Sequence, residues 1–468
     1  MSAADIAATL AMRRTSPSEH WQGLTSPPHG PNTSMDQTTG KRPATTRDGA
    51  SLDDFVAYLP AHSYIYTPIR EMWPAASVNA RLPPPEKGIS ASAWLDQHRA
   101  VEQMTWAPGE PMLIPGRLVS NGGWIKRNGV TCFNLYRPPL PIDGDASNAG
   151  PWLRHIIKLY GKDAARHIVK YFAFKVQHPN RKINHALVLG GDQGVGKDTI
   201  CEPLKYAVGQ WNFEEVSPKV ICGRFNGYVK SVILRINEAR DLGDINRFEF
   251  YEHMKVLTAS PPDVLRVDEK HLREYAVFNV CGVVITTNYK TNGIYLPSED
   301  RRHYVAWTDV RKDHFKQAYW DKIWGWYEYQ GGYGHVAAYL KQLAIFDFNP
   351  KAPPPKTAAF WDIVDANRSP DDAGLADALD LLNRPSAVTI DKIAAVAAPD
   401  TTLWLRDRKN RRSIPFHLEN CGYTPVRNVA AKSDGHWKIS GKRQAVYGRN
   451  DLSLSVRIAA AKALTDGW

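Results

Sequence analysis

The stretch with the clearest chemical potential is glycine-rich and has the sequence GGDQGVGKDT, from Gly190 to Thr199. It follows a short apolar run that predicts a buried strand, and it precedes a segment that predicts a helix. In such a strand–loop–helix arrangement, backbone N–H groups and the helix dipole attract an anion, and a lysine contacts nucleotide phosphates. We therefore predict that the loop binds ATP through nine residues: Gly191, Asp192, Gln193, Gly194, Val195, Gly196, Lys197, Asp198 and Thr199.

Two features of this loop bear on phosphate and metal binding. Lys197 is expected to contact the β- and γ-phosphates as a point charge. The strict pattern places Ser or Thr directly after the lysine as a Mg²⁺ ligand, whereas here Asp198 takes that position and Thr199 follows. We predict a Mg²⁺ site at Asp198 or Thr199. A glycine-rich turn in an unrelated α/β protein is the alternative interpretation.

Two later apolar runs end in polar residues, as the strands of a nucleotide-hydrolysing sheet do. The first, Val232–Ile236, is followed by Asn237 and Glu238. An acid at such a strand end can polarise the attacking water or hold the Mg²⁺ shell. Glu238 is the candidate water activator, and Asp241 is an alternate for the metal shell. The alternative is a glutamate at the sheet edge with no role.

The second run, Val280–Thr287, ends at Asn288, whose amide is predicted to sense the γ-phosphate and the attacking water. The segment after it carries Arg301 and Arg302. A guanidinium that neutralises charge developing on the γ-phosphate is a strong catalytic element, and it can act on a neighbouring subunit. We predict that Asn288 and one of the two arginines complete the catalytic set.

Between these runs, residues 264–277 predict a β-hairpin with a charged tip. Arg266 and Lys270 are the predicted contacts with a DNA phosphate backbone. A solvated hairpin tip without a ligand is the alternative interpretation.

The composition is that of a globular protein with a polyanionic partner. The 468 residues are 43 % hydrophobic and carry a net charge of +11, which favours nucleic acid as the partner. No apolar run approaches the roughly 18 residues that span a bilayer, and the N-terminus lacks the apolar core of a signal peptide. The five cysteines are scattered without a CxxC pair, which argues against a zinc site or disulfide framework. We expect a cytoplasmic protein without a membrane partner.

Changes in composition divide the chain into segments. Residues 1–50, rich in Ser, Thr, Pro and Gly, predict a disordered tail. Residues 51–149 mix aromatic residues with prolines and predict an irregular β-containing lead-in. Residues 150–346 contain the motifs and end in an aromatic, helical part that predicts a lid on an ATPase core. The proline-rich residues 347–372 predict a linker.

Residues 373–468 predict a small basic domain in which helices are followed by a hairpin, a winged-helix-like α+β pattern. A basic stretch near residues 406–421 is expected to face a DNA groove, and the hairpin is expected to contact the backbone. The predicted DNA contacts are Arg408, Arg411, Arg412 and Lys438. A basic domain that docks another protein is the alternative.

The ordered set GGDQGVGKDT, VILRINEARD, LRVDEK, VVITTN and SEDRR resembles superfamily 3 helicases, and is most similar to the helicase module of phage and prophage primase–helicases and primase–polymerases. The resemblance covers roughly residues 150–310. It implies an AAA+-like P-loop NTPase core in which these motifs are Walker A, Walker B, the basic hairpin, the sensor and the arginine finger. It also implies a homo-oligomeric ring, typically a hexamer, with ATP at subunit interfaces and single-stranded or forked DNA in the channel. The setting would be a bacterial host cell, with a separate primase or polymerase as a partner.

Two functions from different classes follow. The first is an ATP-dependent DNA helicase or translocase. The second is an ATP-binding assembly or initiator protein on DNA with little hydrolysis, favoured by Asp198 in place of Ser or Thr and by Asn237 in place of an acid. A small-molecule kinase is a third interpretation, against which the basic C-terminal domain argues.

Overall fold

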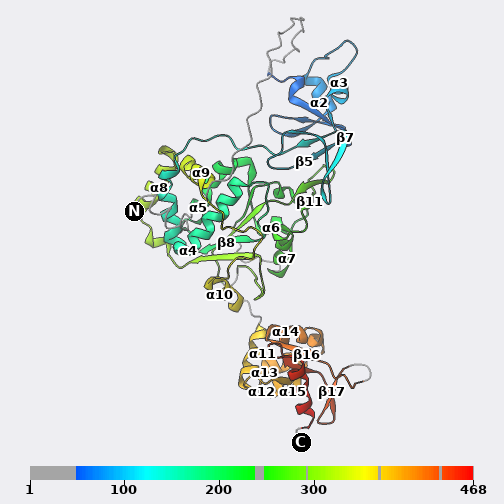
Figure 1. Cartoon of the computed structure of the whole chain (residues 1–468), viewed down its shortest axis with the longest axis vertical. Coiled ribbons are helices and arrows are strands. Elements are labelled where there is room, and N and C mark those ends of the chain that lie inside the picture. The colour runs from blue at the N-terminus through cyan, green and yellow to red at the C-terminus, as the bar shows by residue number, and fades with distance from the viewer. Residues whose placement is uncertain (1–48, 238–246, 291–292, 367–369, 432–434, 467–468) are drawn as a thin grey trace, which may run out of the picture. The chain divides into compact units, whose positions relative to one another are not determined.

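The structure is a computed structural model that describes residues 49–237, 247–290, 293–366, 370–431 and 435–466. The chain forms two compact units, Met1–Ile363 and Val364–Trp468 (Figure 1). Each unit is described by itself. All but the last two residues of the predicted tail, residues 1–50, lie outside the described part.

The first unit is built around a five-stranded parallel sheet with the order β14-β8-β13-β10-β9. Its strands are almost wholly apolar and buried, as expected where both faces of a parallel sheet are covered. Ile285 of β13 pairs with Val188 of β8 and Ile236 of β10, and all three are fully buried. The strands are β8 (Ala186–Gly191), β9 (Phe213–Val216), β10 (Ile233–Ile236), β13 (Gly282–Thr287) and β14 (His303–Thr308).

This strand order determines which loops meet. Because the five strands run in one direction, their carboxyl ends lie at the same edge of the sheet. The glycine-rich loop leaves β8 at this edge, Asn288 follows β13, and Asn237 follows β10. Since β13 lies between β8 and β10, Asn288 belongs to the strand next to the loop and Asn237 to the strand after it.

Three helices pack around α5, the helix that the loop begins, and two further helices follow β9 and β10 in the chain. The element α4, expected as two helices, is one run broken at Gly161, where φ is 74° and ψ is 173°. The indole Nε1 of Trp152 in α4 donates to the carbonyl of Ile200 in α5 at 3.0 Å, which ties the two helices together. The helices are α4 (Gly150–Gln177), α5 (Lys197–Val208), α8 (Gln317–Tyr329) and α9 (Gly332–Gln342), with α6 (Pro218–Ile221) and α7 (Arg247–Thr258).

The lead-in was expected to be irregular, but it forms two small sheets, β3-β2-β1-β4 and β5-β7-β6. Its prolines masked the strand pattern: Pro74 ends β3, and Pro115 lies at a register shift of β6, both positions that a sheet tolerates. Phe55, Ile65 and Leu95 are fully buried within it. Its elements are β1 (Phe55–Tyr58), β2 (Ser63–Tyr66), β3 (Glu71–Pro74), α2 (Ala75–Arg81), α3 (Ala91–His98), β4 (Ala100–Val101), β5 (Gln103–Thr105), β6 (Leu113–Ser120) and β7 (Gly123–Asn134).

The predicted hairpin is present as β11 (Val264–Val267) and β12 (Tyr275–Phe278). It joins the core to the lead-in, because the Thr105 hydroxyl of β5 donates to the carbonyl of Ala276 at 2.8 Å. Val119, Val264 and Ala276 form a small apolar cluster at this junction. The strands of the hairpin are therefore packed against the lead-in.

Residues 347–372, expected as a linker, contain helix α10 (Ala358–Ala366). The helix runs up to and past the end of the first unit at Ile363, and its Phe360 and Ile363 are fully buried. The Thr357 hydroxyl donates to the carbonyl of Val305 in β14 at 2.7 Å and accepts from the N–H of Phe360. The proline run before the helix, residues 353–355, keeps the linker character that the sequence predicts.

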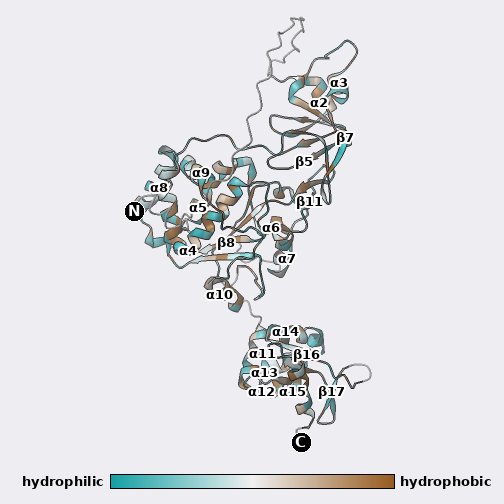
Figure 2. Ribbon diagram, in the orientation of Figure 1, coloured by the Kyte–Doolittle hydropathy of each residue, from teal (hydrophilic) through white to brown (hydrophobic). Residues whose placement is uncertain are grey.

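The second unit combines helices with a three-stranded antiparallel sheet, β15-β19-β16, and a separate hairpin, β17–β18. Leu375, Leu379, Ile393 and Leu418 form its main core. Figure 2 shows hydrophilic residues on the β17–β18 hairpin, where Lys438, Lys442 and Arg443 lie, and Trp437 and Ile439 of β17 are buried in an apolar cluster. The elements are α11 (Pro370–Leu381), β15 (Ala387–Thr389), α12 (Ile390–Val396), α13 (Pro399–Arg406), α14 (Ile414–Asn420), β16 (Tyr423–Val426), β17 (Trp437–Ile439), β18 (Lys442–Gln444), β19 (Val446–Arg449) and α15 (Leu454–Asp466).

Among the described residues, no helix combines the length and apolarity needed to cross a bilayer.

Candidate nucleotide-binding site

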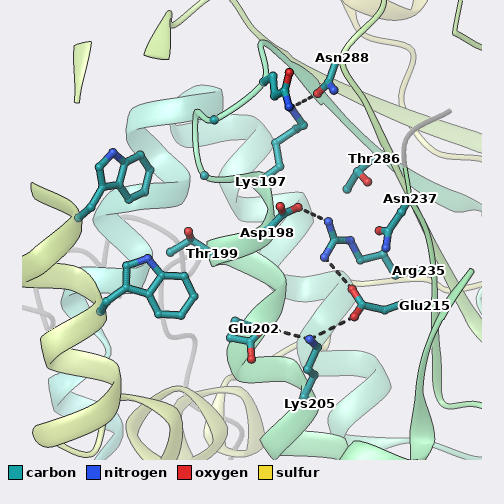
Figure 3. Close-up of a pocket in the computed structure, with 15 residues that line it drawn as sticks. Lys197, Asp198, Thr199, Glu202, Lys205, Glu215, Arg235, Asn237, Thr286 and Asn288 are labelled. Atoms are coloured by element: carbon teal, nitrogen blue, oxygen red, sulfur yellow. Dashed lines mark hydrogen bonds and ion pairs between the residues drawn. The ribbon is translucent and has the colours of Figure 1, made fainter. Parts of the chain in front are cut away.

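A cavity of about 620 Å³ opens at the carboxyl edge of the parallel sheet, beside the glycine-rich loop (Figure 3). Its wall is formed by the loop and α5, by residues of or following β9, β10 and β13, and by two tryptophans of α8. The volume suits a ligand the size of a nucleotide. The lining residues are Gln193, Gly194, Gly196, Lys197, Asp198, Thr199, Glu202, Lys205, Glu215, Arg235, Asn237, Thr286, Asn288, Trp320 and Trp324.

The side chain of Lys197 points back into the loop. Its Nζ donates to the carbonyls of Gly191 at 2.7 Å and Asp192 at 2.8 Å, and to Oδ1 of Asn288 at 2.7 Å. Only 7 % of Lys197 is exposed, so these oxygens take the place of water around the ammonium group. The predicted phosphate contact and the predicted sensor thus lie in hydrogen-bonding contact, and their roles remain predictions.

The loop backbone lies directly against its neighbours, which explains two of its glycines. A Cβ on Gly196, whose φ is +95°, would lie 2.5 Å from Nε2 of His155 and 2.6 Å from the ring of Trp320. A Cβ on Gly190 would lie 2.0 Å from the ring of Trp307. No side chain fits at either position. Helices α4 and α8 are therefore direct neighbours of the loop.

Asp198 is the first member of a chain of ion pairs that crosses from α5 to the sheet. Arg235 of β10 pairs with Asp198 and, through Nη1, with Oε1 of Glu215 at 2.8 Å. Lys205 then bridges Glu215 at 3.2 Å and Glu202 at 3.0 Å. Arg235 and Glu215 meet because they are directly paired on neighbouring parallel strands. The Asp198 carboxylate is therefore held towards β10.

The residues at the predicted Mg²⁺ site offer suitable oxygen donors. Mg²⁺ binds through one or two carboxylates and the substrate phosphates, and Asp198, 77 % exposed in its side chain, supplies a carboxylate. Thr199 supplies a hydroxyl, and Oδ1 of Asn237 is buried without a hydrogen-bond donor among the described residues. Glu238 and Asp241 lie outside the described residues. The donor set fits the metal, although Arg235 competes for Asp198.

The two predicted finger arginines lie elsewhere within the chain. They precede β14, and His303 of that strand pairs with Ala186 at the amino end of β8. The loop leaves the carboxyl end of the same strand, so Arg301 and Arg302 lie at the opposite end of the sheet from the cavity. Arg301 is exposed, and the backbone N–H of Arg302 donates to Oδ1 of Asp300 at 2.9 Å. Neither arginine reaches the cavity of its own chain.

Several cavity residues were missed in the sequence. Arg235 could have been noticed because it precedes Asn237 by two residues and so projects from the same face of the strand. Its partner Glu215 requires the strand register. Trp320 and Trp324 were interpreted as lid packing, although their i, i+4 spacing indicates a shared helix face. Lys312 has no sequence signal, yet its Cβ lies 3.8 Å from where a Cβ on Gly194 would be.

His155 supports the loop from α4. Its Nε2 lies 3.0 Å from the carbonyl of Gly196, and its Nδ1 lies 2.8 Å from the hydroxyl of Tyr319. Because the carbonyl can only accept, Nε2 carries the proton and Nδ1 accepts from the tyrosine. Burial lowers the pKa of His155 to about 4, so the ring is neutral at physiological pH.

The depressed pKa of His155 predicts a pH-dependent contribution to stability. Between about pH 6.5 and pH 4 the unfolded chain protonates this histidine and the folded chain does not, so stability falls as the pH falls. The contribution reaches about 3 kcal/mol at pH 4. Unfolding is followed by circular dichroism at several pH values. Below about pH 6.5, the free energy of unfolding should fall less steeply with falling pH for His155→Gln than for wild type. The control is His271→Gln, at an exposed histidine. The same fall in the free energy of unfolding at acid pH for all three proteins would contradict the prediction.

The predicted DNA contacts are all exposed. Arg266 lies on β11 and Lys270 at the hairpin tip, whose acidic neighbours are held by the core: Asp268 pairs with Arg224 at 2.9 Å and Glu269 with Lys230 at 2.8 Å. In the second unit, Lys438 lies on β17 and the three arginines on a 3-10 segment between α13 and α14 (Arg408, Arg411 and Arg412). Their contact with DNA remains a prediction.

Comparison with known proteins shows the fold. A model of a family of unknown function (DUF5906) matches residues 189–302, from β8 to the residue before β14. No curated protein matches the chain. The chain is similar to the apo structure of the NrS-1 C terminal region, with a TM-score of 0.58 and 14 % identity over 84 % of this chain and 95 % of that one. The A form of the same region gives a TM-score of 0.57, with 14 % identity over 84 % and 96 %.

A further match, to the X-ray structure of JCV helicase, has a TM-score of 0.27 at 13 % identity over 51 % of this chain and 64 % of that one. That score is too low to bear on the fold. The chain is thus a mixed α/β protein with a parallel-sheet core, and it has the fold of the NrS-1 C terminal region.

Proposed function

We propose that the chain is an ATP-dependent DNA motor, a helicase or translocase of phage or prophage DNA replication. The observation that carries the proposal is the contact of Lys197 with Asn288 on the wall of a nucleotide-sized cavity. A loop lysine and a strand-end amide at this distance flank the position that a γ-phosphate would take. The carbonyls that now hold the ammonium group would give way to phosphate oxygens, which are stronger acceptors.

The roles proposed for hydrolysis follow from the order of the motifs in the sequence. Glu238 would accept a proton from water as the water oxygen bonds to the γ-phosphorus, and the bond to the bridging oxygen breaks to release ADP. Asn288 would orient this water. Mg²⁺, held by Asp198 or Thr199, would supply positive charge to the phosphate oxygens. Arg301 or Arg302 would act on the site of a neighbouring subunit, since neither reaches the cavity of its own chain. A ring, typically a hexamer, provides such neighbours.

DNA would be bound by both units. The hairpin tip would track the backbone of single-stranded or forked DNA through Arg266 and Lys270. The second unit, with its helices, three-stranded sheet and projecting hairpin, would serve as a winged-helix-like domain on DNA. Its exposed arginines and Lys438 are the proposed contacts. A separate primase or polymerase would be the replication partner.

The decisive experiment measures ATP hydrolysis by the purified chain with and without single-stranded DNA, beside Glu238→Gln. The motor is supported if DNA stimulates hydrolysis and the substitution abolishes it while ATP binding persists. Transfer of phosphate to a small acceptor without DNA dependence would support a kinase instead.

A second function is favoured by the Asp198–Arg235 ion pair. A guanidinium beside the metal position can keep Asp198 from binding Mg²⁺, and slow hydrolysis would then accompany normal binding. The chain would in that case be an ATP-dependent assembly or initiator protein on DNA. If the wild-type protein binds ATP and assembles on DNA but hydrolyses no ATP, the result would support this second function instead of the motor.

The hairpin gives a further prediction. Lys270→Ala is expected to weaken single-stranded DNA binding several-fold, and to reduce the slope of log K against log[salt] by about 0.7, the value for one lost phosphate contact. Fluorescence anisotropy at salt concentrations from about 50 to about 300 mM measures both the affinity and its salt dependence. Lys341→Ala, an exposed lysine on α9, is the matched control. Unchanged affinity and slope for Lys270→Ala would remove the hairpin tip from the DNA interface.

A further inference from the structure

The cavity has an aromatic wall that phosphate binding does not use. Trp320 and Trp324 project from one face of α8, line the cavity and are each partly exposed. Thr199 and Glu202 of α5, labelled in Figure 3, line the same cavity. Aromatic side chains are typical of the lining of ligand pockets, where a few polar groups fix the orientation of the ligand.

This wall is fixed in place. Trp320 packs against Gly196, and its ring lies 5.3 Å from the ring of Phe315 and 5.4 Å from that of Tyr319, edge-on to the latter. The Tyr327 hydroxyl donates to the carbonyl of Thr199 at 2.8 Å, which joins α8 to the first turn of α5. The aromatic wall is therefore tied to the glycine-rich loop by direct contacts.

We propose that Trp320 and Trp324 form a stacking shelf for the base of the bound nucleotide. The inference rests on the proposed binding of a nucleoside triphosphate and deepens it. Both tryptophans line the same cavity as the loop, so they are available to the base of a nucleotide whose phosphates occupy the loop. Aromatic side chains stack on any base, and stacking strength rises with ring area.

The shelf determines the class of nucleotide. The carboxylate next to it, Glu202, is already paired with Lys205 at 3.0 Å, so it is poorly placed to read the edge of a base. In the proposed shelf, stacking area is therefore the main basis of selection. The site takes purine nucleoside triphosphates, with ATP and GTP bound alike and both bound more tightly than CTP or UTP.

The test compares nucleotides with inorganic tripolyphosphate by calorimetry in the presence of Mg²⁺. Wild type is expected to bind ATP and GTP within about threefold of each other, and at least about ten-fold more tightly than tripolyphosphate. Trp324→Ala is expected to remove most of this ten-fold difference without changing tripolyphosphate binding. Trp320→Phe and Trp324→Phe keep an aromatic ring and should retain most of it.

Trp361→Ala, a half-exposed tryptophan of α10, is the control for the loss of an indole outside the cavity. Unchanged tripolyphosphate binding shows that a variant has kept its loop intact, so a folding defect is recognised as such. If ATP is bound no better than tripolyphosphate, or if Trp324→Ala leaves the preference for ATP intact, the shelf is overturned while the phosphate site stands. If neither ligand binds, the proposed function itself fails.

Discussion

Replacing Lys197 by alanine is expected to weaken Mg²⁺–ATP binding by about 100-fold or more and to abolish any hydrolysis. The ammonium group is the positive charge that the loop directs at the phosphates, and charge-assisted hydrogen bonds in a desolvated site are the strongest that a loop can offer. Calorimetry with a non-hydrolysable ATP analogue measures the loss directly. Thermal unfolding measures separately the cost of losing the three hydrogen bonds that the ammonium group makes to Gly191, Asp192 and Asn288.

Lys205→Ala is the matched control for this experiment. Lys205 lies two turns further along the same helix and lines the same cavity, but it is committed to Glu202 and Glu215. It should leave ATP affinity within about threefold of wild type, the scale of a surface ion-pair change. Equal losses of ATP affinity for Lys197→Ala and Lys205→Ala would mean that the affinity depends on the net charge of the cavity and not on one lysine. The phosphate role of Lys197 would then be refuted.

The second large effect concerns Asp198 and Asn237. The usual pattern has Ser or Thr after the loop lysine and an acid at the strand end. Here the acid, Asp198, follows the lysine and an amide, Asn237, follows the strand, and both residues line the same cavity. Asp198→Ser should therefore remove the carboxylate from the metal site and lower Mg²⁺-dependent ATP affinity by about ten-fold or more. Asn237→Asp in the same chain should restore most of the affinity, because it returns a carboxylate to the opposite wall.

Mn²⁺ titration followed by electron paramagnetic resonance, with ATP analogue present, reports metal affinity independently of turnover. Glu202→Gln, a carboxylate of the same cavity further along α5, is the control and should leave Mn²⁺ affinity unchanged. Single and double substitutions whose effects simply add would contradict a shared metal site, since coupled ligands give non-additive changes. Unaltered Mn²⁺ binding by Asp198→Ser would mean that the ion pair with Arg235 is the sole role of Asp198.

Local signals in the sequence were sufficient for most elements of the core. The strand before the glycine-rich loop, the helix after it, the hairpin and the strands ending at Asn237 and Asn288 are all present, because each combines an apolar run with a clear breaker. The predictions of an irregular lead-in and of a linker at α10 failed because prolines interrupt the apolar pattern there. Their prolines lie at strand ends, at a register shift and before a helix, where they interrupt the pattern without preventing structure.

The chemistry around the loop depends on contacts that no local pattern encodes. The pairing of Asp198 with Arg235 and Glu215 arises from the register of β9 with β10, and the contact of Lys197 with Asn288 arises from the insertion of β13 next to β8. The aromatic wall exists because α8, more than 100 residues beyond the loop, packs on α5 through Tyr327 and Thr199. The candidate phosphate site could thus be proposed from ten consecutive residues, since backbone N–H groups and a lysine act locally. The surroundings of the proposed metal and base sites could not, because strand order and helix packing bring distant residues together.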